Sequence, residues 1–115
     1  MSQVFDAKEL LERVDNDWDF LAETVEMLST DGPGVLDAIR QSVVSGDAAA
    51  VGRAAHTFKG LVANFCAPDV QESAFALEQA GKAGDLSGSS VAVEELRARF
   101  DALVAALTAF LATRP

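Results

Sequence analysis

Apolar residues recur at spacings of three and four along almost the whole chain, and turn-forming residues divide this pattern into five segments. Such spacing is typical of helices with one buried face, whereas half-buried strands show strict alternation of apolar and polar residues. Half of the 115 residues are hydrophobic, which is enough for a packed core, and tyrosine is absent. The pattern therefore predicts an all-α fold, and the length predicts a single domain over residues 1–115.

Turn signals set the bounds of the five predicted helices. They cover residues 6–14, the stretch from the Asp15-Asn16-Asp17 turn to Gly46, residues 48–66, residues 68–83, and a last helix capped by Ser89 or Ser90 that includes the apolar tail 102–112. An Asp or Asn of the 15–17 turn and Asp47 are expected N-caps, and Gly46 and Gly84 are expected to end their helices. The Asp-Gly-Pro-Gly run at 31–34 is expected to break or kink the second helix.

The packing of these helices follows from their lengths and their apolar faces. Because short loops join helices of 15 or more residues, we expect an antiparallel four-helix bundle with a short additional N-terminal helix at one end. The apolar tail is too short for a membrane span, so it is expected to be buried. Trp18 is expected to be a packing residue. The residues expected on the buried faces of the second and third helices are Phe20, Leu21, Val25, Leu28, Val51, Ala55, Phe58, Val62 and Phe65.

The chain is acidic, with 18 Asp and Glu against 9 Lys and Arg and a net charge of -9. A surface of this sign repels phosphate backbones and anionic lipids, so neither nucleic acid nor a membrane is an expected partner. The first residues, MSQVFDAKELL, lack the basic and apolar regions of a secretory signal. The single cysteine, Cys66, cannot form an internal disulfide. Together these features predict a cytoplasmic protein.

His56 is the only histidine, so any imidazole chemistry of the chain must occur there. At about 100° per residue it lies roughly 140–160° from the apolar face of its helix, which predicts an exposed ring. Gly52 and Gly60 stand one turn before and one turn after it. Each glycine costs about 1 kcal/mol relative to alanine inside a helix. We expect them to leave the imidazole open to a second protein, with Ala63 extending this smooth surface.

Positive charge flanks the same ring, because Arg53 and Lys59 stand three residues before and three residues after His56. An exposed neutral imidazole is a nucleophile at physiological pH. A phosphoryl group attached to it would be stabilised by Lys59, with Arg53 as a second candidate, through charge-assisted hydrogen bonds. The pattern therefore favours a surface phosphoryl acceptor over an incidental solvated helix face.

Residues 55–65 read AHTFKGLVANF, and this stretch resembles the signature A-H-T-L-K-G-x-x-x-N-hydrophobic of histidine-containing phosphotransfer (HPt) domains. The similarity continues downstream through ALEQA at 76–80 and GDL at 84–86. Upstream, the Ser-Gly-Asp turn at 45–47 resembles the Gly-Asp turn that precedes the histidine helix in the family. With its helix count and order, the resemblance covers nearly the whole chain and implies a helical phosphotransfer bundle.

The resemblance implies a function and a partner for the exposed histidine. HPt domains take a phosphoryl group from the aspartyl phosphate of a receiver domain and pass it to another receiver. His56 matches the phosphorylated residue, Lys59 matches the lysine near the phosphate, and Gly60 matches the glycine that permits close docking. The residues expected to contact the receiver are Gly52, Arg53, Gly60, Ala63 and Asn64.

Glu78 stands where the family often has a Gln or Glu that hydrogen-bonds the imidazole. Such a contact would hold Nδ1–H and leave Nε2 free to attack, which is the orienting logic of a catalytic triad. The alternative for Glu78 is an exposed i,i+4 ion pair with Lys82. Cys66 replaces a glycine found in many members, and it is expected to pack as a small apolar residue near the helix end.

Other functions fit the sequence less well than phosphotransfer. Neither G-x-x-x-x-G-K-[ST] nor G-x-G-x-x-G occurs, so no ATP-dependent kinase activity is expected. Acidic residues from Asp15 to Glu26 match part of a calcium loop, but Phe20 occupies the position that needs glycine, so a helix cap is favoured. No metal site or cofactor of its own is expected, and Mg²⁺ is expected from the receiver. The remaining alternative is a non-catalytic HPt-like adaptor that binds a receiver without accepting phosphate; in either case we expect a monomer.

Overall fold

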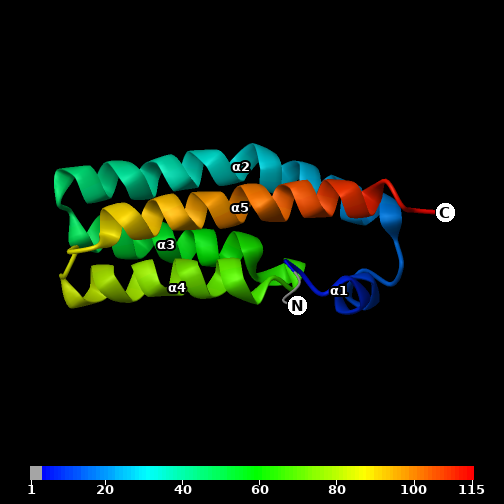
Figure 1. Cartoon of the computed structure of the whole chain (residues 1–115), viewed down its shortest axis with the longest axis horizontal. Coiled ribbons are helices and arrows are strands. Elements are labelled where there is room, and N and C mark those ends of the chain that lie inside the picture. The colour runs from blue at the N-terminus through cyan, green and yellow to red at the C-terminus, as the bar shows by residue number, and fades with distance from the viewer. Residues whose placement is uncertain (1–3) are drawn as a thin grey trace.

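The computed structural model describes residues 4–115, which form a bundle of antiparallel helices. The elements are α1 (Ala7–Arg13), α2 (Trp18–Ser45), α3 (Ala48–Val62), a 3₁₀ turn η1 (Ala63–Phe65), α4 (Pro68–Ala83) and α5 (Ser89–Leu111). Figure 1 shows α2 to α5 side by side, each reversing the direction of the one before it, with α1 at the end where α2 begins and α5 ends. The predicted all-α four-helix bundle with a short N-terminal helix is confirmed. Among the described helices, none combines the length and hydropathy that a membrane span requires.

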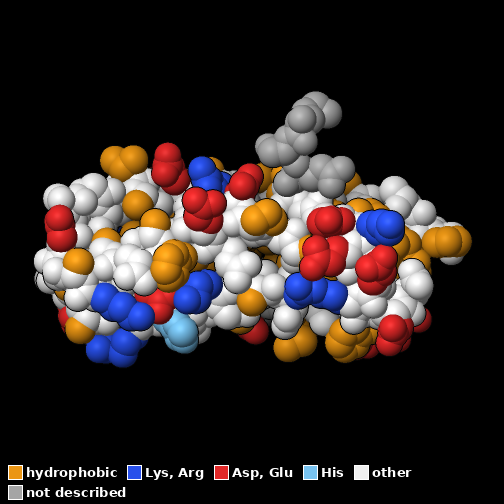
Figure 2. Space-filling view, turned by 90° about the horizontal axis from the view of Figure 1, so that it is seen from below, with side chains coloured by type: hydrophobic (Ala, Val, Ile, Leu, Met, Phe, Trp, Pro, Cys, Tyr) orange, Lys and Arg blue, Asp and Glu red, His pale blue; other side chains and the backbone are white. Residues whose placement is uncertain are grey.

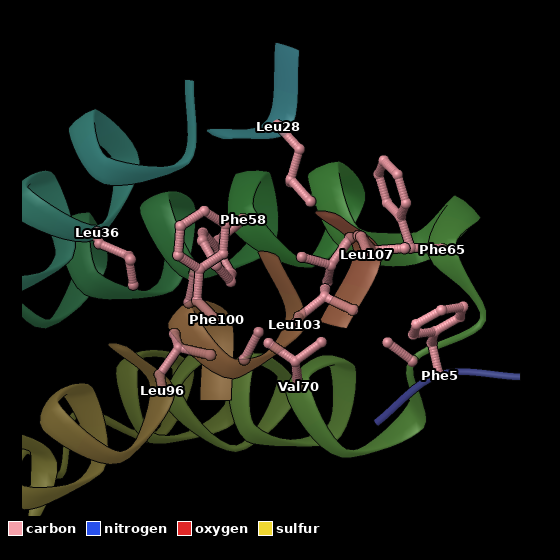
Figure 3. Close-up of a cluster of buried hydrophobic side chains, with 14 of the residues drawn as sticks. Phe5, Leu28, Leu36, Phe58, Phe65, Val70, Leu96, Phe100, Leu103 and Leu107 are labelled. Atoms are coloured by element: carbon pink, nitrogen blue, oxygen red, sulfur yellow. The ribbon is translucent and has the colours of Figure 1, made fainter. Parts of the chain in front are cut away.

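The core lies between the four long helices, which each contribute one apolar face (Figure 3). At its middle the rings of Phe58 and Phe100 meet edge to face, with centroids 5.5 Å apart. Trp18 packs as predicted, because its ring lies 5.0 Å from that of Phe110. Phe20 was expected on the buried face, but its side chain is half exposed, so that prediction is wrong. Leu21, one position later, was predicted on the same face and is fully buried, so that prediction is confirmed.

α2 runs without interruption through the Gly-Pro-Gly run, so the predicted break of this helix is wrong. Gly32 is buried against α5, and a Cβ atom at this position would lie 2.3 Å from Cζ of Phe100. This glycine therefore permits close packing of two helices and makes no turn. Pro33 removes one helical hydrogen bond, but tertiary packing along the 28-residue helix outweighs that local cost.

The helix ends follow the sequence signals in most places. Asp17 and Asp47 cap α2 and α3 as predicted, since the Oδ1 atom of each accepts a hydrogen bond from the backbone N–H three residues later, at 3.0 and 3.1 Å. Gly46 and Gly84 end α2 and α4 in the left-handed conformation, with φ of 72° and 70°. The predicted capping of α5 is wrong, because no side chain caps it and the N-cap is Gly88.

α3 ends at Val62, before the predicted boundary at residue 66, and the chain continues through η1 to Cys66. Cys66 has φ of 56°, in the left-handed region that favours glycine. Its side chain is half buried against the core, as expected for a small apolar residue, and burial raises the pKa of its thiol. The carbonyl of Cys66 accepts a hydrogen bond from Asp6 N at 2.8 Å, which ties the N-terminal segment to the end of α3.

Candidate functional site

His56 projects into solvent from α3, as the helical phase predicts. Its side chain is 68% exposed, whereas Ala55 and Phe58 on the opposite face are fully buried. Figure 2 shows the imidazole at the surface, with lysine and arginine side chains on both sides and an acidic side chain between them. The ring is therefore open to a partner and surrounded by charge.

The acidic group beside the ring is Glu78, which α4 places directly under it. Oε2 of Glu78 lies 2.9 Å from Nδ1 of His56 and 3.2 Å from Nζ of Lys82, and Oε1 lies 2.6 Å from Nζ of Lys59. Its side chain is only 3% exposed. The hydrogen bond from Lys59 lowers the pKa of Glu78 to about 2 against the opposing effect of burial, and hydrogen bonds from His56 and Lys82 add to this shift. Glu78 is therefore ionised at neutral pH.

The negative charge on Glu78 determines which nitrogen of the His56 imidazole carries the lone pair. An ionised carboxylate accepts hydrogen bonds but cannot donate one, so Nδ1 of His56 must carry the proton that the two groups share. In a neutral imidazole the lone pair then lies on Nε2. Both contacts weighed for Glu78 are present, since it bonds His56 and also pairs with Lys82. The carboxylate is buried, however, and does not form the exposed pair that the second alternative assumed.

The two lysines that contact Glu78 differ in exposure. The side chain of Lys59 is 26% exposed, and its ammonium lies 5.1 Å from the ring centroid of Phe75, at cation–π distance. The side chain of Lys82 is 63% exposed. No motif marks Phe75 in the sequence; its position three residues before Glu78, on one face of α4, is the signal that would have found it.

α3 and α4 come into backbone contact beside the site, at Gly52 and Gly81. A Cβ atom on Gly81 would lie 2.4 Å from N of Gly52, which leaves no room for a side chain, whereas a Cβ atom on Gly52 would have its nearest neighbour at 3.6 Å. Both glycines are buried. Gly52 was expected on the exposed docking surface, and that prediction is wrong, because α4 covers it. The close approach instead brings Glu78 under His56.

The other predicted docking residues lie at or near the surface. Gly60 and Asn64 are exposed, Ala63 is half buried in η1, and a Cβ atom on Gly60 would meet nothing within 4 Å. Arg53 is exposed, and within residues 4–115 it forms no ion pair. These positions are compatible with contact to a second protein, and their role in docking remains a prediction.

Two surface hollows flank the histidine. Beyond Gly60 and Asn64 lies a groove of about 500 Å³ between α1, α2 and the end of α3. Its apolar lining consists chiefly of Leu10, Phe20, Leu21, Met27, Leu28, Leu61 and Phe65. On the other side, a more open cavity is lined by His56 itself together with Arg53, Thr57, Glu78 and Lys82. The groove beyond Gly60 is therefore mainly apolar, whereas the cavity that His56 itself lines carries charged side chains.

A helical bundle that presents one exposed histidine held by a buried carboxylate has the construction of a phosphoryl carrier. The family model for the Hpt domain matches residues 23–106, and the chain belongs to this family of histidine phosphotransfer proteins. The fold is similar to the crystal structure of histidine-containing phosphotransfer protein B (HptB) from Pseudomonas aeruginosa PAO1, with a TM-score of 0.89, 19% sequence identity and coverage of 100% of both chains. Comparison with the curated proteins gives no match.

Within the described part of the chain, no cluster of three or more His, Cys, Asp or Glu side chains could hold a metal ion. The carboxylate beside the histidine already contacts two ammonium groups. The charges around His56 therefore suit an imidazole ring that is itself cationic and that carries an anionic group.

Proposed function

We propose that this protein relays a phosphoryl group between receiver-domain aspartates of a two-component phosphorelay through His56. The observation that carries the proposal is the fixed imidazole of His56. Its Nδ1 lies 2.9 Å from the buried, ionised carboxylate of Glu78, while the His56 side chain is 68% exposed. This arrangement selects one tautomer and directs the other nitrogen toward solvent. A phosphoryl acceptor needs this combination of fixed orientation and access.

The proposed transfer is an in-line displacement. The lone pair on Nε2 attacks the phosphorus of the receiver's aspartyl phosphate, an N–P bond forms, and the P–O bond to the aspartate breaks to release its carboxylate. Nδ1 keeps its proton, so the phosphorylated ring is cationic, and the charge of Glu78 balances it. Attack by the carboxylate of a second receiver reverses these changes and restores the neutral imidazole.

Positioning and charge neutralisation account for most of the catalysis in such a transfer. We propose that the receiver supplies Mg²⁺ together with its aspartate, and that this chain supplies the oriented imidazole and the nearby ammonium groups. The chain then acts as an intermediate carrier without kinase activity of its own.

The docking surface that we propose lies on the Gly60 side of His56. Gly60 leaves open space beside the ring, and the adjoining groove exposes Phe20 and Met27 to solvent at 50% and 62%. Large exposed apolar side chains next to a reactive group mark a protein contact. We propose that a receiver domain binds one copy of this chain here in a transient complex.

Incubation with a panel of phosphorylated receiver domains tests this proposal. We expect at least one receiver to transfer acid-labile phosphate to the wild-type protein, and we expect none to label His56→Gln. Label retained in His56→Gln would overturn the assignment of the acceptor. Receivers that bind tightly but never label the wild type would favour the adaptor function instead.

A further inference from the structure

The three groups that contact Glu78 are not equally free to leave it. Lys59 has two anchors, because its ammonium lies 2.6 Å from Oε1 and 5.1 Å from the centroid of the Phe75 ring. Lys82 has only the 3.2 Å contact to Oε2 among the described residues. The side chain of Lys82 is also more than twice as exposed as that of Lys59, at 63% against 26%.

The two oxygens of the Glu78 carboxylate would be affected differently if their lysine partners moved away. Oε1 is buried, and its close partner among residues 4–115 is the ammonium of Lys59, 2.6 Å away. Departure of Lys59 would leave a buried charged oxygen unpaired, which is strongly unfavourable. Oε2 is shared by Lys82 and Nδ1 of His56, so departure of Lys82 would leave that oxygen still hydrogen-bonded.

The positions of the cations around the His56 ring also distinguish Lys82 from Lys59. The open cavity that His56 lines is also lined by Lys82 and Arg53, whereas Lys59 is not among its lining residues. An anion held on the ring at this side would therefore meet Lys82 and Arg53. Lys59 instead lies between the carboxylate of Glu78 and the ring of Phe75.

We propose that Lys82 is the cation that binds the phosphoryl group on His56, and that Lys59 is a positioning residue that fixes Glu78. The proposal rests on the phosphotransfer function proposed above, and it reassigns the role that family resemblance gives to Lys59. When Nε2 takes the phosphoryl group, the ring becomes cationic while Nδ1–H stays on Oε2. Lys82 then moves from Oε2 to a phosphoryl oxygen. Glu78 therefore faces two positive groups before transfer and two after it.

Loading of His56 by phosphoramidate, a small phosphodonor that needs no docking surface, tests the proposal directly. We expect Lys82→Gln to take up phosphate at least about ten-fold more slowly than wild type, which is the loss of one charge-assisted hydrogen bond to the anion. Lys82→Arg should recover most of the rate. The imidazole ¹⁵N spectrum of unphosphorylated Lys82→Gln should match that of wild type, because His56 and Lys59 still hold Glu78.

Lys59→Gln should act indirectly, because the loss of Lys59 changes the position of Glu78 and therefore the orientation of the imidazole. We expect its imidazole ¹⁵N spectrum to change before any phosphate is added. Arg114→Gln, which removes one positive charge at the C-terminus, is the control for net charge and should load like wild type. The proposal is overturned if Lys82→Gln loads at the wild-type rate, or if Lys59→Gln slows loading while its imidazole spectrum is unchanged. Failure of the wild type to load from both phosphoramidate and every receiver would instead remove the proposed function, and this inference with it.

Discussion

The two sides of His56 look alike in the sequence and differ in the structure. Glycine stands one helical turn away on each side, at positions 52 and 60. On the Gly52 side α4 packs against the backbone, and Glu78 and Lys82 come with it. On the Gly60 side a Cβ atom would have no neighbour within 4 Å, and an apolar groove follows. The same residue type thus lies under a packed helix on one side and faces open space on the other.

This asymmetry separates two tasks of the site. The α4 side orients the imidazole and carries the charge that a phosphoryl group needs. The Gly60 side offers an unobstructed apolar surface to a partner. Changes on the α4 side should therefore alter either the orientation of the imidazole or the loading of His56 from a small phosphodonor. Changes on the Gly60 side should alter only transfer between proteins.

Gly60→Gln should give the largest effect, because it places a long side chain where a receiver must approach. We expect transfer from the best receiver to fall by about 100-fold, the size of loss that a misplacement of about 1 Å causes. Loading from phosphoramidate should be unchanged. Gly60→Ala is the matched control, with a smaller loss of transfer and up to about 1 kcal/mol of added helix stability. Normal transfer by Gly60→Gln would show that docking does not use this side.

Gly81→Ala should destabilise the α4 side by about 1–3 kcal/mol, the typical cost of overpacking, because its Cβ atom would lie 2.4 Å from N of Gly52. Gly52→Ala should change stability by no more than about 1 kcal/mol, since its Cβ atom has room and alanine favours helix. Urea unfolding of both variants measures the difference. Equal effects of the two substitutions would contradict the close contact described for α3 and α4.

Glu78→Gln should change how stability depends on pH. The pKa of Glu78 is about 2 in the folded protein and 4.5 ordinarily, so its charge stabilises the fold fully above about pH 4.5, and this contribution is lost as pH falls toward 2. The stability of wild type relative to Glu78→Gln should therefore decrease over this interval and stay constant above it. Urea midpoints from pH 2 to 7 test this, and a difference that does not vary with pH would contradict the ion-pair cluster.

Cys66→Gly should have the smallest effect, a small change in the free energy of unfolding. This residue follows η1, beyond Gly60. Relief of the left-handed conformation, worth about 1 kcal/mol, offsets the packing that the thiol loses. Cys66→Ala keeps the strain and also loses the contacts of the thiol, so it should be less stable than Cys66→Gly by about 1 kcal/mol. Thermal or urea unfolding that ranks the alanine variant as equal or better would refute this account of residue 66.

Features that depend on local periodicity could be predicted from the sequence. The exposure of His56 follows from its angle to Phe58 and its neighbours on one helix, which is a local property. The Asp17 and Asp47 caps are likewise local, because each aspartate bonds a backbone N–H three residues away. The signature around the histidine identified the family, and the family model confirms it.

Features that depend on contacts between different helices could not be predicted from local periodicity. Gly32 is explained by Phe100, which is 68 positions away, so the local run at 31–34 gave a wrong expectation of a break. The glycine at position 81 is explained by the backbone of Gly52, and the burial of Glu78 depends on residues from both α3 and α4. Long-range contacts therefore override the local meaning of glycine and of an acidic side chain.

The central claim is that Glu78 holds Nδ1–H of His56 and leaves Nε2 as the phosphoryl acceptor. Long-range ¹H–¹⁵N correlation of the imidazole, recorded before and after transfer from a receiver, measures this most directly. The predicted result is a ring protonated at Nδ1 in the free protein and carrying phosphorus on Nε2 afterwards. Protonation at Nε2 in the free protein, phosphorus on Nδ1, or label on another residue would contradict it.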